Sequence, residues 1–498
     1  MNMKYKAYLC SFLLTFPILG KASVEADSLR QIQISRLQEQ VNWVNPEAIR
    51  AYLDDTKSSL GDKATGLYQK LEELETLLPR VNRHLSEDTT RQTIAEAEKL
   101  LALKREIILA NPLLDVDKIL IARYRLGNKA RKAMGPSLGT SVANYNSLFS
   151  SRRKGYDAEI SQLSNLRGDI QSKTIYKPEA DVPISDIQLH WDANRLLFSS
   201  LNENRQWQIY EINTDGTGLH QKVVVDEPDL EFCDANYLPD GKVVATCNIG
   251  YNGVPCVHGD DVVANLVSYD PETKNIHRLT FDQDGNWAPI VIPNGRLMYT
   301  RWEYTDLTHY FSRIVMHMNP DGTENKALYG SGSYFPNSTF DMKPLSKYNS
   351  RFVGIISGHH GTARSGRLII FDPAKSRKEE KGMVQELPFS KRPIVPIIKD
   401  ELVEGVWPQF MKPYPLNEKY FLVACKPGPD ALWGIYLVDI YDNLTLVANA
   451  DDAGMIYSVP VKSTPVPPAI PDRIKPNEKE ATVFIQDIYE GEGLKGVP

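Results

Sequence analysis

The chain has 498 residues, of which 42% are hydrophobic and 24% are charged. This composition is typical of folded globular proteins and excludes global disorder and collagen-like structure. The 57 Lys and Arg residues are outnumbered by 63 Asp and Glu residues, so no basic excess indicates a nucleic-acid partner. At about 100–200 residues per domain, the length predicts two to four domains.

The first 22 residues have the pattern of a secretory signal peptide. Lys4 and Lys6 form a short basic start, and the apolar stretch Ala7–Leu19 is shorter than a membrane span requires. Small side chains at Gly20 and Ala22 predict cleavage after Ala22. The alternative is an uncleaved anchor. With cleavage the protein is periplasmic or extracellular, and no later segment is apolar enough to predict a transmembrane span.

Four cysteines follow the predicted cleavage point: Cys233, Cys247, Cys256 and Cys425. In an oxidising compartment Cys247 and Cys256 can form a disulfide across the end of a hairpin, because the sequence Tyr251-Asn252-Gly253 between them is typical of a turn. The alternative is a set of free, buried thiols. The sequence contains no Cys-x-x-Cys-His motif, so no covalent c-type haem site is expected in this chain.

Residues 23–112 have a helical pattern. Apolar side chains at Leu67, Leu71, Leu74 and Leu78 fall on one face of a helix, which predicts a small helical N-terminal domain. Residues 113–180 are interpreted as a connector with a long loop, although Lys118–Tyr124 has the apolar character of a buried strand.

From residue 181 the sequence changes to short strands separated by turns. Two turn types recur roughly every 50 residues. Examples of one type are Asn213–Gly216, Asp270–Thr273, Asn319–Gly322 and Asp372–Lys375, and examples of the other are Leu238–Gly241 and Ile292–Gly295. Repeated four-stranded units of this length predict a mainly β fold, a six-bladed β-propeller of the TolB or WD40 type, over residues 181–460.

Five units are clear, and the sixth is expected from residues 455–490, with an early strand near Thr174–Tyr176 closing the ring. A pair of β-sandwiches is the competing architecture. Residues 461–498 are interpreted as a proline-rich linker and a terminal strand, which is expected to begin a further domain.

Several long runs in the propeller region resemble a secreted bacterial family related to the middle domain of the hydrazine synthase alpha subunit. These runs are Asp234–Gly241, Leu279–Asp284, Arg301–Asp306, Phe311–Arg313, His317–Gly322, Gly358–Gly361 and Leu432–Asp439. The resemblance implies a six-bladed propeller that, in hydrazine synthase, is flanked by domains carrying c-type haems. Because this chain lacks the haem-attachment motif, the resemblance implies a propeller serving a cytochrome-like redox partner and does not imply hydrazine synthesis.

One loop collects an unusual number of polar and aromatic side chains between two predicted strands. Since propeller loops converge at the channel mouth, it is a candidate site for a small ligand or a partner protein. The candidate ligand-binding residues are Arg301, Glu303, Tyr304, Asp306, Tyr310 and Arg313. Glu303 and Asp306 are the candidate general acid and base. The alternative is an internal network of ion pairs and hydrogen bonds that fixes this loop.

Histidines on different units are candidates for a zinc or iron site. His309, His359 and His360, with His258 as a further candidate, supply imidazole ligands if the units bring them together.

Two main hypotheses for the function follow from these observations. The first is a binding or assembly module that serves a redox partner, and the second is a metal-dependent enzyme with its site at the channel mouth. A carbohydrate-binding scaffold is a third, suggested by the aromatic content alone.

Overall fold

The computed structural model describes most of the chain after residue 29. The described residues are 30–31, 33–87, 90–125, 144, 147–254, 259, 261–302, 312–332, 335–345, 350–362, 364–475, 477–480, 483, 494 and 496. The predicted signal peptide and the predicted strand over 481–489, Val483 apart, therefore lie outside the described residues.

The N-terminal part is helical, as predicted. A helical segment over 33–41 is followed by α2 (Pro46–Leu60), α3 (Lys63–Glu87) and α4 (Arg91–Leu109). Helix α2 begins at Pro46 because the side chain of Asn45 accepts the backbone N–H groups of Glu47 and Ala48 at 3.0 and 3.4 Å. The predicted leucine face of α3 is buried at Leu67, Leu71 and Leu74.

Sixteen strands form four four-stranded antiparallel sheets. One sheet consists of β4 (Ile184–Leu189), β5 (Arg195–Leu201), β6 (Trp207–Asn213) and β7 (His220–Gln221). The next consists of β8 (Phe232–Tyr237), β9 (Val243–Cys247), β10 (Asn265–Tyr269) and β11 (Ile276–Arg278). A third consists of β20 (Gln409–Pro415), β21 (Tyr420–Lys426), β22 (Gly434–Asp439) and β23 (Leu444–Ala448). The fourth has the order β24 (Ala453–Pro460), β1 (Lys118–Arg125), β2 (Ala158–Ser164) and β3 (Gln171–Tyr176).

The remaining strands form an eight-stranded sheet. Its first half is β12 (Asn286–Val291), β13 (Leu297–Trp302), β14 (Arg313–Met318) and β15 (Lys326–Tyr329). Its second half is β16 (Ser338–Pro344), β17 (Phe352–Ser357), β18 (Arg367–Phe371) and β19 (Met383–Leu387). The halves are joined by one parallel pairing, between Arg313 and Ser338, so the sheet consists of two four-stranded units.

The predicted connector differs from the structure. Residues 113–180 contain β1, β2 and β3, which form a sheet with β24 from the other end of the chain. Lys118–Tyr124 is a buried strand, as its apolar character indicates. The strand predicted near Thr174–Tyr176 is part of β3, which lies in the same sheet as β24, as its outermost strand. The partner of β1 lies more than 300 residues away, at Ala453–Pro460, so no local pattern reveals the pairing.

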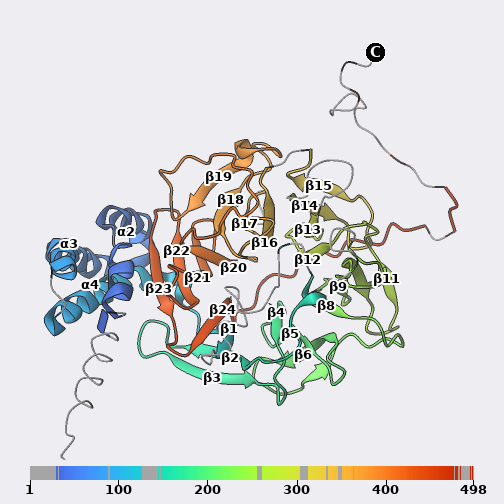
Figure 1. The fold of residues 1–498 in the computed structure, drawn as a ribbon, viewed down its shortest axis with the longest axis horizontal. Coiled ribbons are helices and arrows are strands. Elements are labelled where there is room, and N and C mark those ends of the chain that lie inside the picture. The colour runs from blue at the N-terminus through green and yellow to red at the C-terminus, as the bar shows by residue number, and fades with distance from the viewer. Residues whose placement is uncertain are drawn as a thin grey trace, which may run out of the picture.

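The sheets are arranged around a centre (Figure 1), with β4, β8, β12, β16, β20 and β24 innermost. Apolar side chains fill the spaces between neighbouring sheets, and Trp207, Trp287, Trp302 and Trp433 are fully buried there. The tryptophans that recur along the repeat therefore act mainly as packing residues.

The helices pack against the outer edge of the ring, beside β23 (Figure 1). Lys104 of α4 is buried and donates from Nζ to the carbonyl oxygen of Leu444 at 2.7 Å. Arg105 donates to the carbonyls of Leu446 and Val447 at 3.3 and 3.2 Å. One continuous apolar core joins the helices to these sheets, so the two parts form one body.

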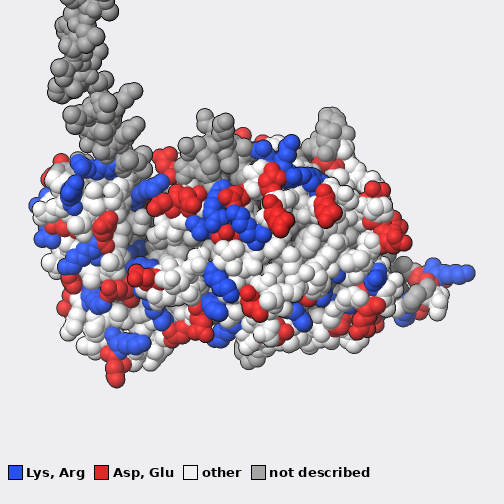
Figure 2. Space-filling model, turned by 90° about the horizontal axis from the view of Figure 1, so that it is seen from below, with Lys and Arg blue, Asp and Glu red and all other residues white. Residues whose placement is uncertain are grey.

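Basic and acidic side chains are interspersed over the side of the molecule seen in Figure 2. Among the described residues, none of the helices combines the length and the apolar character that a membrane span needs.

Candidate functional site

Each innermost strand carries a β-bulge at the same place. The strand register shifts within β4, β8, β12, β16, β20 and β24. One residue at each shift has a left-handed backbone, with φ between 50° and 64°. These residues, called the bulge ring below, are Asp186, Asp234, Ala288, Asp341, Lys412 and Tyr457. A bulge turns a side chain out of the strand's regular alternation, and here all of the bulge-ring residues line the central pocket.

Side chains of the bulge ring accept backbone N–H groups from the next member. The hydroxyl of Tyr457 accepts the N–H of Asp186 at 2.5 Å. Asp186 Oδ2 accepts the N–H of Asp234 at 3.2 Å, and Asp234 Oδ2 accepts that of Ala288 at 3.3 Å. The bulge-ring residues therefore take part in a series of hydrogen bonds that links neighbouring sheets.

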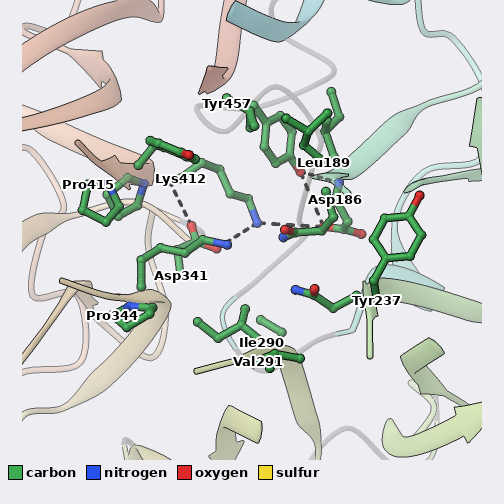
Figure 3. A pocket seen from close by; sticks show the side chains of 18 of the residues that line it. Asp186, Leu189, Tyr237, Ile290, Val291, Asp341, Pro344, Lys412, Pro415 and Tyr457 are labelled. Carbon is green, nitrogen blue, oxygen red and sulfur yellow. Dashed lines mark hydrogen bonds and ion pairs between the residues drawn. The ribbon is translucent and has the colours of Figure 1, made fainter. Parts of the chain in front are cut away.

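Lys412 adds an ion pair and a backbone hydrogen bond to this series (Figure 3). Its backbone N–H donates to Asp341 Oδ2 at 3.2 Å, and its Nζ lies 2.8 Å from Asp341 Oδ1. The same ammonium lies 3.9 Å from Asp186 Oδ1 and 5.5 Å from the centre of the Tyr457 ring. The carboxylates around it raise the pKa of Lys412 well above its ordinary value, so this lysine stays charged.

Asp234 titrates differently from an exposed aspartate. Burial, together with the negative charge of Asp186, raises the pKa of the Asp234 carboxyl to about 7. The carboxyl also accepts the hydroxyl of Thr246 at 3.3 Å. Near neutral pH, part of the population therefore carries a proton on Asp234.

Arg364 packs on the side of the bulge ring that faces away from the pocket. The Arg364 guanidinium lies 4.9 Å from the ring centre of Trp287 and 4.6 Å from that of Phe340, the residues that directly precede Ala288 and Asp341. The N–H of Arg364 donates to Asn144 Oδ1 at 2.6 Å, which joins Asn144 to this side.

The pocket lies on the other side and has a volume of about 310 Å³. On each innermost strand its lining begins at the bulge ring and continues toward the strand's end, so the bulge ring is the floor. The walls combine polar side chains at Gln188, Asn236 and Lys343 with apolar ones at Ile290 and Tyr414. A pocket with a charged floor and mixed walls is suited to a small polar molecule with an apolar part.

The proline-rich segment 461–475, called the strap below, follows β24 and runs from the centre of the ring past β12 toward its periphery (Figure 1). The N–H of Thr464 donates to the carbonyl of Trp191 at 2.9 Å, and Lys462 and Thr464 line the pocket. Further along, Asp472 lies 3.5 Å from the Lys242 ammonium. The start of the strap is therefore part of the pocket wall, and contacts with Trp191 and Lys242 hold the strap on the ring.

The predicted loop site is only partly described. Glu303, Tyr304, Asp306, His309 and Tyr310 lie outside the described residues, as do Cys256 and His258. Arg301 pairs with Asp282 at 3.1 Å. Arg313 is fully buried, with its guanidinium 4.5 Å from the ring centre of Trp302 and 2.6 Å from His359 Nδ1.

The two predicted metal-binding histidines are adjacent but differ in environment. Burial and the Arg313 charge lower the pKa of His359 to about 3, and the arginine lies at its Nδ1. His360 is exposed and lies 2.8 Å from Asp400 Oδ2. Within the described part of the chain, no three His, Cys, Asp or Glu residues are arranged to hold a metal. A site that includes His309 stays a prediction.

The predicted disulfide does not appear at Cys247. This residue carries a free, buried thiol at the end of β9, as do Cys233 and Cys425 at their positions. Burial raises the pKa of the Cys247 thiol to about 12, which makes it a small apolar core residue. Its predicted partner Cys256 is outside the described residues.

The sequence interpretation missed the bulge ring, whose members are spread over more than 270 residues. A usable signal was present, because Asp186, Asp234, Asp341 and Lys412 each interrupt the apolar first strand of a repeat. A charged residue recurring at that point of a propeller repeat faces the channel.

No protein-family model and no curated protein matches this sequence. Solved structures do. A hydrazine synthase chain of Kuenenia stuttgartiensis matches with a TM-score of 0.52 and 15% identity over 72% of this chain and 48% of that chain. TolB from Acinetobacter baumannii matches with a TM-score of 0.41 and 13% identity over 74% of this chain and 72% of that chain. The fold is a β-propeller.

The resemblance to hydrazine synthase seen in the sequence is thus confirmed for the fold. This β-propeller chain spans about half the length of the hydrazine synthase chain that it matches, 48%. At 15% sequence identity, the match shows a shared fold and nothing more. Activity, substrates and partners are argued from the site.

Proposed function

We propose that this protein is an exported six-bladed propeller that acts as a binding or assembly module and holds a small ligand in its central pocket. The observation that carries the proposal is a central pocket whose floor is a set of ion-paired and hydrogen-bonded side chains. Lys412 lies between Asp341 and Asp186, and both carboxylates accept further hydrogen bonds. Groups held in this way fix the shape of a site, whereas a general acid or base needs a free partner atom.

The six-bladed ring is part of this proposal. Its support is that four four-stranded sheets and the two halves of the eight-stranded sheet follow one another, with β24 pairing with β1. The periplasmic or extracellular location rests on the basic and apolar pattern of residues 1–22.

Ligand binding is tested by filling the pocket. Asn236→Trp and Gln188→Trp each place a large side chain in the cavity from a different strand. We expect thermal shift screening to identify small molecules that stabilise the native protein, and both variants to lose that stabilisation while remaining folded. A ligand that stabilises the native protein and both variants equally would place binding elsewhere and contradict the proposal.

A cytochrome-like redox partner is the second part of the proposal and rests on the resemblance to the hydrazine synthase alpha subunit. It is tested by co-purification from a periplasmic or secreted fraction, followed by absorption spectra of the captured material. A Soret band in a stoichiometric complex is expected. Capture of stoichiometric partners without haem would contradict a redox role.

The metal-dependent enzyme considered above stays an alternative prediction, since His309 is outside the described residues. Iron and zinc content per mole of the mature, tag-free protein decides it. About one equivalent that survives dialysis, and is lost in His360→Ala, would favour the enzyme.

A further inference from the structure

Of the two lysines that the innermost strands contribute to the pocket, Lys343 is the one that makes no ion pair with the floor. It lies on β16, two residues beyond Asp341, and its half-buried side chain lines the pocket. Lys412, by contrast, is held between Asp341 and Asp186. Within the described part of the chain, no hydrogen bond or ion pair engages the Lys343 ammonium, although its backbone is paired with Val353 in the sheet.

The pocket lining contains three lysines, Lys343, Lys412 and Lys462, and three aspartates, Asp186, Asp234 and Asp341. Asp186 and Asp341 are engaged by Lys412 and by backbone N–H groups, and Asp234 is partly protonated near neutral pH. At the mouth the exposed Lys462 adds a second positive charge. Burial lowers the pKa of Lys343 to about 8, although the Asp341 carboxylate favours the charged form, so the ammonium is still mostly protonated at neutral pH.

The walls beside Lys343 are apolar and rigid. Pro289 and Ile290 come from β12, Pro344 follows Lys343 on β16, and Pro413 and Tyr414 come from β20. A volume of about 310 Å³ is at the small end of the range for ligand pockets. These surfaces suit a compact apolar group, and bare inorganic anions make no use of them.

We propose that the central pocket binds a small organic carboxylate, with the carboxylate on the Lys343 ammonium and the apolar part against the proline and tyrosine walls. This inference rests on the proposed function and gives it a ligand class. An unpaired, half-buried ammonium destabilises a protein unless an anion neutralises it, so the ligand would supply the missing charge.

The experiment uses a matched panel on the full-length mature protein: benzoate and cyclohexanecarboxylate, the neutral benzamide, the cationic benzylammonium, and inorganic phosphate. Isothermal titration and thermal shift are measured for the native chain, Lys343→Met and Lys343→Arg. Lys154→Met, at an exposed lysine away from the pocket, is the control. Lys343→Met is expected to fold, because it replaces an unpaired charge with an apolar chain of similar length.

A carboxylate is expected to bind the native protein and Lys154→Met equally, and to lose at least about tenfold in affinity in Lys343→Met, with partial recovery in Lys343→Arg. Equal binding of benzamide, preference for phosphate, or undiminished binding in Lys343→Met overturns the inference. So does failure of every carboxylate to bind at millimolar concentration.

Failure of the inference can be told from failure of the proposed function. If benzamide or benzylammonium binds and Asn236→Trp abolishes that binding, the pocket binds ligands and only the carboxylate class is wrong. If thermal shift screening also finds no pocket-dependent ligand of any charge, the proposed function fails as well.

Discussion

Lys412 Nζ lies 2.8 Å from Asp341 Oδ1, so an ion pair in the molecule's centre joins two neighbouring sheets. The two residues occupy equivalent bulges on β16 and β20, and the backbone N–H of Lys412 donates to the same carboxylate. The pair therefore fixes both the charge and the spacing of the floor.

We expect Lys412→Met to lower the free energy of unfolding by about 3–5 kcal/mol, because it leaves Asp341 and Asp186 without their buried counter-ion. Urea denaturation followed by tryptophan fluorescence measures the change. The double variant Lys412→Met, Asp341→Asn should regain part of the loss. A loss below about 1 kcal/mol, as at an exposed pair, would contradict the buried ion pair.

Because the pKa of Lys343 is lowered, we expect the free energy of unfolding to increase with pH in the alkaline range. Its pKa in the folded protein is lowered to about 8, so between that value and the ordinary lysine pKa of about 10.4 the unfolded chain binds more protons than the folded one. Stability therefore increases with pH across this window. Urea denaturation at pH 7.5, 9 and 10 should show this contribution in the native chain and not in Lys343→Met. Parallel profiles would contradict it.

Because the pKa of Asp234 is raised, we expect the free energy of unfolding to decrease with rising pH in the acidic range. Its raised pKa of about 7 means that the folded protein binds more protons than the unfolded chain from about pH 4 upward. Its contribution to stability is present at low pH and is lost as the pH rises toward 7. Asp234→Asn keeps an acceptor for the Ala288 N–H and cannot ionise. We expect the advantage of the variant over the native chain to grow between pH 5 and 7.5, and a constant difference would show that the carboxyl is not perturbed.

Replacing Gly295 with alanine is expected to loosen the strap. A Cβ at this position would collide with the carbonyl oxygen of Pro468, and the residue has a φ of 87°. Gly241 occupies the equivalent turn between β8 and β9 with a φ of 92° and has open space around it. Both Ala variants incur the left-handed backbone strain of about 1 kcal/mol. Only Gly295→Ala should speed tryptic cleavage in the strap, at Lys462 and Arg473. Equal cleavage in both variants would indicate that the strap does not bind there.

Local patterns predicted the parts of the fold that local chemistry determines. The leucine spacing of Leu67, Leu71 and Leu74 gave the helix, and turns such as Leu238–Gly241 gave the strand boundaries. The pairing of β1 with β24 escaped this reasoning, because it joins strands more than 300 residues apart, and β1 lies outside the predicted propeller region of 181–460.

The candidate site shows the same limit. Dense local chemistry drew attention to Arg301–Arg313, where the described members form structural contacts: Arg313 with His359, and Arg301 with Asp282. The pocket floor instead takes single residues from strands about 50 residues apart, and its geometry depends on bulges that have no sequence motif of their own.

The pairing of β24 with β1 also determines the order in which the molecule can be completed. Strands β1–β3 are synthesised early, yet their sheet lacks its innermost strand until Ala453–Pro460 is available. Until then β1 has a row of unpaired backbone groups, which is a template for pairing with other chains. Contacts of such long sequence separation form slowly, so we expect the last strand to set the folding rate and the β1–β24 seam to be where a misfolded chain aggregates.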